Sequence, residues 1–227
     1  VEKELIDWCK TQTIKRHRDF QTAWFHLGAD IHNVLPSLGL PQNAHKILNT
    51  LTKQPTFLMV GTIEPRKGHK QVLDAFEQLW KDGIAVNLAI VGKQGWMMEG
   101  TNKKLKQHSE LNKQLFWFEG ISDEYLEKVY ANSICLIAAS EGEGFGLPLI
   151  EAAQYKMPIL ARDIPVFQEV AGQYADYFKG SESEVLAQKI KQWLEQYKQN
   201  KHLKSEKMPW MSWQQSATQL LTKLGIN

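Results

Sequence analysis

Short apolar runs alternate with longer segments of helical periodicity from about Pro55 onward. Uninterrupted apolar runs of this length are typical of strands that are buried on both faces, as in parallel sheets covered by helices. The predicted strands lie, in chain order, at 56–61, 86–92, 115–118, 134–139, 158–161 and 174–178. This alternation predicts an α/β fold with a doubly wound, Rossmann-like parallel sheet.

Helices are predicted between these strands, because parallel neighbours need crossover connections. They lie at 67–81, 102–111, 122–131, 147–155 and 164–171. In the first of them, Val72, Phe76, Leu79 and Trp80 belong to one apolar stripe. Ser122 precedes two acidic residues, which is a helix start signal. The pattern is therefore consistent along the whole predicted sheet.

The two ends of the chain fall outside this alternation. Residues 1–50 contain a predicted helix at 2–12, an apolar stretch at 22–28 and a polar connection. Residues 209–227 contain a predicted helix at 212–224. We therefore divide the sequence into 1–50, a sheet domain at 51–208 and a C-terminal segment at 209–227.

Composition excludes some classes of partner. The net charge is only +2, from 27 basic and 25 acidic side chains, which does not favour nucleic acid. Lysines recur through one helical stretch, at 189, 191, 198, 201, 204 and 207. The favoured interpretation is a solvated helix face, and the alternative is contact with an anionic membrane surface.

The two cysteines and the lengths of the apolar runs bear on location. Cys9 and Cys135 are far apart in sequence, and Cys135 lies in a predicted buried strand, which favours a reducing compartment. The longest apolar runs have strand length, well short of the roughly 18 residues of a membrane-spanning helix. We expect a cytoplasmic protein without a signal peptide.

The loop after the 134–139 strand is rich in glycine and leads into a helix. Gly142, Gly144 and Gly146 allow the backbone to approach a ligand closely, and Pro148 suits the first helical turn. Amides at a helix start, with the positive end of the helix dipole, attract a phosphate or carboxylate. Glu143 in the loop and Glu151 one turn into the helix are expected to face one cleft.

The loop after Val60 places two cations, Arg66 and Lys67, at the same edge of the sheet. Ligands of open parallel sheets bind outside the carboxyl ends of the strands, and paired cations neutralise a diphosphate there. Together the two loops offer cations and amides for phosphates, and carboxylates for hydroxyl groups. A nucleoside diphosphate sugar presents both kinds of group.

Three other chemistries fit less well. A dinucleotide-binding fingerprint would need a glycine where Leu147 stands. A glycoside hydrolase needs one carboxyl group with a raised pKa, whereas Glu151 near a helix start is expected to stay ionised. The seven histidines lack metal-ligand spacing and no Asp-x-Asp pattern occurs, so we expect no metal and no other cofactor.

The segment Glu143 to Glu151 resembles the signature of retaining GT-B glycosyltransferases of family 4, the glycosyl transferases group 1 family: two glutamates separated by seven residues. The core from Gly144 to Pro148 matches, and the stretch Val60 to Gly68 resembles the family's phosphate loop. The resemblance covers Pro55 to about Phe178 and the terminal helix. It implies the C-terminal, donor-binding half of a hexosyltransferase.

The resemblance also implies roles for individual residues. Glu143 would stabilise the transition state at the donor sugar, Arg66 and Lys67 would balance the charge of the leaving group, and Glu151 would hold the ribose. Gly92, Lys93, Gly120 and Ile121 would line the base pocket, whereas Gly61, Thr62, Gly144, Phe145, Gly146 and Leu147 would meet the sugar and diphosphate. The family's retaining mechanism would need no metal.

Two departures from the family pattern bear on specificity and completeness. Many relatives carry arginine where Thr62 stands, and the stretch Gly61 to Lys67 resembles a bacterial mannosyltransferase subset that acts in O-antigen, capsule and lipopolysaccharide assembly. This favours GDP-mannose over UDP-sugars. The family's N-terminal acceptor domain needs far more than 50 residues.

Residues 1–50 are therefore expected to be the end of that domain and the interdomain linker. Within them, Trp24 to Asp30 resembles an entering strand and turn. The terminal helix would pack back toward the N-terminal domain. A polysaccharide or glycolipid acceptor would bind through the missing domain, with peripheral inner-membrane contact, and the fragment alone would be inactive. A non-catalytic nucleotide-sugar or carbohydrate-binding module is the alternative.

Overall fold

The computed structural model describes residues 2–12, 20–30 and 39–226. These form two compact units, one made of residues 1–30 with 210–227 and the other of residues 31–209. The larger unit contains a sheet of six parallel strands in the order β3-β2-β1-β4-β5-β6. The strands are β1 (Thr56–Val60), β2 (Asn87–Val91), β3 (Leu115–Phe118), β4 (Cys135–Ala138), β5 (Ile159–Arg162) and β6 (Asp176–Phe178). The predicted α/β class and parallel sheet are confirmed.

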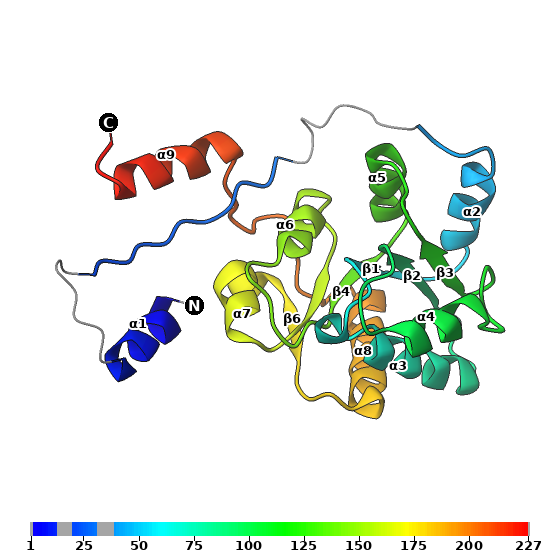
Figure 1. The fold of residues 1–227 in the computed structure, drawn as a ribbon. Coiled ribbons are helices and arrows are strands. Elements are labelled where there is room, and N and C mark those ends of the chain that lie inside the picture. The colour runs from blue at the N-terminus through cyan, green and yellow to red at the C-terminus, as the bar shows by residue number, and fades with distance from the viewer. Residues whose placement is uncertain (1, 13–19, 31–38, 227) are drawn as a thin grey trace. The chain divides into compact units, whose positions relative to one another are not determined.

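Helices cover both faces of this sheet (Figure 1). One face carries α3 (His69–Lys81), α4 (Glu99–Lys106) and α8 (Ser183–Lys198), and α3 packs along α8. The other face carries α2 (Ala44–Leu51), α5 (Asp123–Ala131) and α6 (Leu147–Gln154), with α7 (Pro165–Ala171) packed against α6. Two short 3-10 turns, η2 (Pro65–Lys67) and η3 (Gly172–Tyr174), precede α3 and β6.

A cluster of aromatic rings lies in the core between the sheet and helices α3 and α8. Phe57 on β1 meets Phe76 edge-on at 5.6 Å between ring centroids and Trp193 of α8 at 5.3 Å. All three rings are fully buried. Such edge-to-face pairs stabilise beyond the burial of their area, so α3 and α8 are fixed against the central strand.

Two differences from the sequence prediction have local causes. The predicted helix 67–81 is broken, because Gly68 adopts a left-handed conformation (φ +77°) between η2 and α3. Residues 44–50 were assigned to the segment 1–50, the expected domain end and linker, but residues 44–51 form α2, whose Ala44, Leu48 and Leu51 are buried. The structure therefore places α2 with the sheet unit, and this helix begins at Ala44, before the expected boundary at 51.

The smaller unit contains α1 (Glu2–Thr11), residues 20–30 and α9 (Trp213–Lys223). The Ser212 side chain caps α9 together with Gln215. Residues 20–30 form neither strand nor helix, so the strand expected within Trp24 to Asp30 is wrong. Their polar groups pair with α9 instead: the His26 amide donates to Gln219 (3.0 Å), and the Ser216 hydroxyl donates to the His26 carbonyl (2.6 Å).

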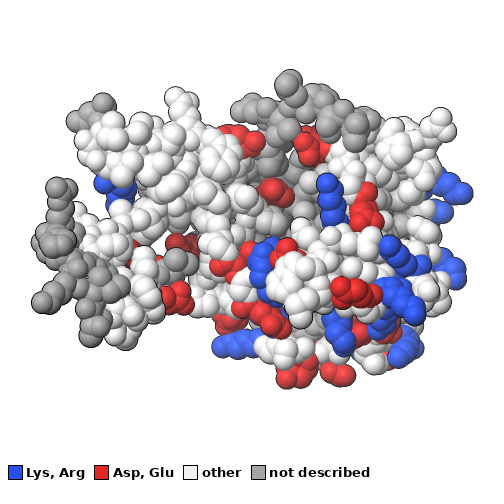
Figure 2. All heavy atoms as spheres, viewed as in Figure 1, with Lys and Arg blue, Asp and Glu red and all other residues white. Residues whose placement is uncertain are grey.

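Basic and acidic side chains are interspersed on the face shown in Figure 2, as the small net charge implies. In the basic stretch of α8, Lys191 pairs with Asp82 at 2.6 Å and Lys198 with Glu195 at 2.7 Å. Paired lysines of this kind fit a solvated helix face. No helix among the described residues is both long enough and apolar enough to span a membrane.

Candidate functional site

The candidate site lies where the strand order reverses. β1 pairs with β2 on one side and with β4 on the other, so the connections from β1 and β4 leave toward opposite faces. Doubly wound sheets bind ligands at such a switch point, beyond the carboxyl ends of the strands. The two loops there run from Gly61 to Gly68 and from Ala139 to Gly146. They carry the cations and the glutamate that the sequence singled out.

These two loops are in backbone contact. The Glu141 amide donates to the Arg66 carbonyl at 2.7 Å. A Cβ atom added to Gly68 would lie 2.4 Å from the Ala139 carbonyl oxygen, and the positive φ of Gly68 also requires glycine. The chain folds this way because only glycine permits so close a backbone approach.

Glu143 is the centre of a polar cluster. Its carboxylate accepts hydrogen bonds from the Lys67 ammonium group, from the Arg66 guanidinium at 3.0 Å and from the Ser140 hydroxyl at 2.9 Å. Arg66 also donates to the Gly142 carbonyl at 3.1 Å and pairs with Glu64 at 3.1 Å. The structure thus brings together all three residues predicted to be catalytic.

The partners of Glu143 decide its charge. Burial alone would raise the pKa of the carboxyl group, but hydrogen bonds from Lys67, Ser140 and Arg66, together with the charge of Lys67, lower it, and the pKa lies below its ordinary value. The Lys67 side chain is 14% exposed and that of Arg66 is 46% exposed. Glu143 is therefore an anion held between a largely buried cation, Lys67, and an accessible one, Arg66.

A small cavity adjoins this cluster. Lys67, Ser140 and Glu143 line it together with Gly146 and the Phe167 ring. Gly146 stands before α6 with φ +98°, and no side chain caps the helix there. The first amides of a helix lack partners within the helix, so the α6 start offers donors beside an apolar ring.

The remaining residues of the expected donor site surround the ends of β1 to β3. Gly92 approaches Gly61 so closely that an added Cβ would lie 1.9 Å from the Gly61 carbonyl oxygen. An added Cβ on Gly120 would lie 3.9 Å from the Lys93 side chain. Thr62 is exposed and Ile121 is half-buried. The loops after these three strands are neighbours at one edge of the sheet.

Glu151 does not join the Glu143 cluster in the structure. It accepts a hydrogen bond from the Tyr130 hydroxyl of α5 at 2.8 Å. Burial raises the pKa of Glu151, the Tyr130 hydrogen bond lowers it, the charge of Asp123 raises it, and the net direction is upward. The pKa is raised because Glu151, the fifth residue of α6, lies deep in the protein, and the expectation that it stays ionised remains a prediction.

Three residues in this region were given no role from the sequence. Ser140 follows a buried strand and stands three residues before Glu143, so its position was a usable signal. Tyr130 approaches Glu151 from another helix, and no local pattern announces it. His69 directly follows Gly68 and is 1% exposed, and neither ring nitrogen has a hydrogen-bond partner of normal geometry.

Burial and the charge of Lys67 lower the pKa of His69 to about 4, against an opposing influence of the Gly61 backbone. His69 is therefore a neutral imidazole beneath the loop. Within the described part of the chain, no group of three or more His, Cys, Asp or Glu side chains is placed to hold a metal ion. Metal independence stays a prediction.

Comparisons with known proteins agree with this picture. A family model, Glycosyl transferases group 1, matches residues 42–208. The serotype-specific mannosyltransferase WbdA of Escherichia coli is 54% identical over 202 residues, which is 89% of this chain and 25% of WbdA. The chain thus spans about a quarter of the length of that curated relative.

Two solved structures share the fold. HepE of Anabaena, in complex with UDP and glucose, superposes with a TM-score of 0.68 at 16% identity, covering 88% of this chain and 55% of that one. The C-terminal domain of LpcC from Francisella tularensis gives a TM-score of 0.57 at 19% identity, covering 82% of this chain and 94% of that one.

Proposed function

Because the chain belongs to the glycosyl transferases group 1 family, we propose that it is the donor-binding part of a mannosyltransferase. Its substrate is a nucleoside diphosphate sugar, with GDP-mannose favoured over UDP-sugars. The observation that carries the proposal is the joining of Arg66, Lys67 and Glu143 at the sheet switch point. The identity to WbdA supports mannose as the sugar.

The donor's diphosphate occupies the place where the two cations now hold Glu143. Phosphate oxygens compete for Arg66, whose accessible guanidinium suits bidentate contact, and for the Lys67 ammonium group. Amides at the α6 start bind the same diphosphate. Glu143 is then released toward the sugar, at the mouth of the small cavity that it lines.

Transfer breaks the bond between the anomeric carbon and the diphosphate oxygen. The acceptor hydroxyl forms the new bond on the same face of the sugar, its O–H bond breaks and its proton passes to the departing diphosphate oxygen, on which the negative charge develops. Arg66, Lys67 and the loop amides stabilise that charge, and Glu143 stabilises the positive charge that develops on the sugar ring. Catalysis of this kind depends on positioning and preorganised electrostatics and uses no metal.

The base and ribose lie along the ends of β2 and β3. Gly92, Lys93, Gly120 and Ile121 line the base pocket, and Glu151 meets the ribose after Tyr130 shifts or shares its hydrogen bond. The acceptor is a polysaccharide or lipid-linked glycan that binds through an N-terminal domain. With a lipid-linked acceptor, the proposed enzyme works in the cytoplasm and makes peripheral contact with the cytoplasmic face of the inner membrane.

Calorimetric titration of this chain with GDP-mannose, GDP, UDP-glucose and UDP tests the proposal. GDP-mannose and GDP are expected to bind more tightly than the uridine compounds. A transfer assay with an intact N-terminal domain present follows. Binding without any transfer would make the chain a non-catalytic nucleotide-sugar module, and failure of all four compounds to bind would refute donor binding.

A further inference from the structure

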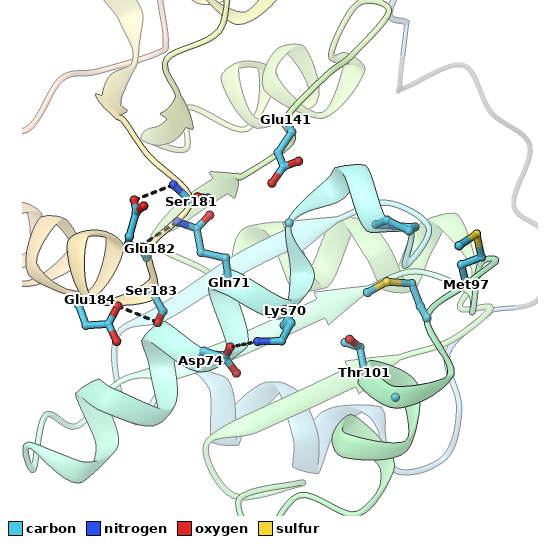
Figure 3. Close-up of a pocket in the computed structure, with 14 residues that line it drawn as sticks. Lys70, Gln71, Asp74, Met97, Thr101, Glu141, Ser181, Glu182, Ser183 and Glu184 are labelled. Atoms are coloured by element: carbon cyan, nitrogen blue, oxygen red, sulfur yellow. Dashed lines mark hydrogen bonds and ion pairs between the residues drawn. The ribbon is translucent and has the colours of Figure 1, made fainter.

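A second, larger cavity lies on the other side of the Gly61–Gly68 loop (Figure 3). Its volume is about 590 Å³, within the range of small-molecule sites. Its walls come from α3, from the start of α4 and the residues before it, from the loop after β4 and from residues 181–184, where α8 begins. We name it the α3–α8 pocket, after Gln71, Asp74, Met98, Gly100, Glu141 and Glu182, which line it.

The charge of the α3–α8 pocket differs from that of the donor site. Its charged side chains are four carboxylates, on Asp74, Glu141, Glu182 and Glu184, and one ammonium group, on Lys70. Such a lining repels phosphate and nucleotides. Ionised carboxylates accept hydrogen bonds only, so they suit a ligand rich in hydroxyl donors.

The pocket also has an apolar edge. Met98 and Met97 line it, and the Met97 side chain is 72% exposed. Trp96, the preceding residue, is 58% exposed. Large apolar side chains clustered in water often mark a binding groove. A sugar ring presents hydroxyl groups at its edge, which suit the carboxylates, and C–H groups on its faces, which suit the apolar side chains.

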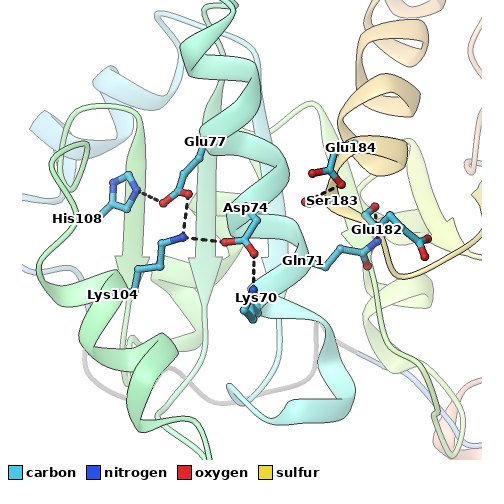
Figure 4. A network of polar contacts seen from close by, with 9 residues as sticks. All are labelled: Lys70, Gln71, Asp74, Glu77, Lys104, His108, Glu182, Ser183 and Glu184. Carbon is cyan, nitrogen blue, oxygen red and sulfur yellow. Dashed lines mark hydrogen bonds and ion pairs between the residues drawn. The ribbon is translucent and has the colours of Figure 1, made fainter.

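The polar wall of the pocket is held in place before any ligand binds (Figure 4). Asp74 accepts from Lys70 at 2.7 Å and from Lys104 at 2.8 Å, and Lys104 also pairs with Glu77 at 2.8 Å. The Gln71 amide donates to the Glu182 carbonyl at 3.0 Å. Each Asp74 oxygen keeps a further lone pair for a hydroxyl donor. A wall fixed in this way loses little entropy on binding.

We infer that the α3–α8 pocket binds a neutral oligosaccharide, namely a stretch of the acceptor glycan or its elongated product. This inference rests on the proposed function, which makes a glycan one of the two substrates. Pro65 and Gly68 line the pocket, whereas Arg66 and Lys67, which lie between these two residues in the sequence, form ion pairs with Glu143. One loop therefore separates a site for phosphate from a site for hydroxyl groups.

Calorimetry or NMR titration of this chain with α-linked mannotriose, alone and with GDP present, tests the inference. Mannotriose is expected to bind with a Kd on the order of 1 mM and without competition from GDP. In Gly100→Trp, the added side chain starts in open space at the pocket wall, and mannotriose should bind at least about tenfold more weakly while GDP binding is unchanged. Lys46→Trp, on exposed α2 surface, is the size-matched control and should bind as the wild type does.

A second variant removes charge and keeps volume. Glu182→Gln combined with Glu184→Gln is expected to weaken mannotriose binding, again without an effect on GDP. Three results would overturn the inference. In the first, the wild type fails to bind mannotriose. In the second, Gly100→Trp and the charge variant both bind mannotriose as tightly as the wild type does. In the third, GDP displaces mannotriose. Loss of GDP and GDP-mannose binding with mannotriose still bound would instead sink the proposed donor function alone.

Discussion

Lys67 donates a hydrogen bond to Glu143 across 76 residues of sequence, and both side chains are largely buried. Neither loop alone could fix such a contact, because each supplies only one partner. The pair exists because β1 and β4 are neighbours in the sheet. Removal of Glu143 leaves the Lys67 charge without this partner, whereas Glu143 without Lys67 keeps Arg66 and Ser140.

Turnover is expected to depend on both members of this pair. Under the proposed function, and in an assay with an intact N-terminal domain present, Glu143→Ala and Lys67→Ala should each lower kcat by about 100-fold or more, because each removes a charge that stabilises the proposed transition state. Lys81→Ala, at the exposed end of α3, should leave kcat unchanged. Near-normal turnover in both site variants would contradict the assignment.

The close approach of Gly92 to Gly61 predicts a steric effect. Gly92→Ala places a Cβ against the Gly61 carbonyl, so the two loops must separate, at a cost of about 1–3 kcal/mol in the free energy of unfolding. Gly142→Ala in the neighbouring loop meets open space and is the matched control. Urea denaturation compares them, and identical midpoints for the two variants would show that the loops yield without strain.

The Tyr130–Glu151 hydrogen bond predicts energetic coupling between α5 and α6. Tyr130→Phe should lower the free energy of unfolding by about 1–3 kcal/mol, because a buried carboxyl group loses its donor. A double-mutant cycle with Glu151→Ala isolates the interaction, and Tyr174→Phe serves as a control. Additive effects of the two changes would mean that the bond contributes nothing.

The buried His69 predicts a dependence of stability on pH. Between pH 6.5 and about 4 the unfolded chain binds a proton at this residue and the folded chain does not, so stability falls as pH falls through that window. From pH 7.5 to pH 5 the loss should reach about 2 kcal/mol. Over the same pH range, the free energy of unfolding of His69→Leu should fall by about 2 kcal/mol less than that of the wild type. His45→Leu, a control at an exposed position, should lose as much stability as the wild type.

Much of the fold followed from local pattern, because buried parallel strands are continuous apolar runs. The strand expected at 115–118 agrees with β3 in both bounds, and Ser122 caps α5 as predicted. Ala44, Leu48 and Leu51 have the apolar spacing of a helix, but this pattern covers only eight residues and polar residues flank it, so α2 was not predicted. A helix of eight residues is not stable by its own helix propensity, so its formation depends on packing that the local sequence does not show.

The candidate site was predictable where it depends on strand ends. Arg66, Lys67 and Glu143 meet because the ends of adjacent parallel strands share one edge of the sheet. The environment of Glu151 was not predictable, since a tyrosine from another helix and the depth of burial decide it. The α3–α8 pocket likewise draws its carboxylates from three separate segments, none of which shows a motif.

The pairing of Phe57 with Cys135 sets an order for folding during synthesis at the ribosome. β1, β2 and β3 emerge in sequence and can pair as they appear, but the other edge of β1 must wait for β4. A nascent chain that stops before Cys135 exposes a row of unpaired amides and carbonyls on an apolar strand, which favours association with other chains. Chaperone dependence should therefore be greatest for translation intermediates of that length.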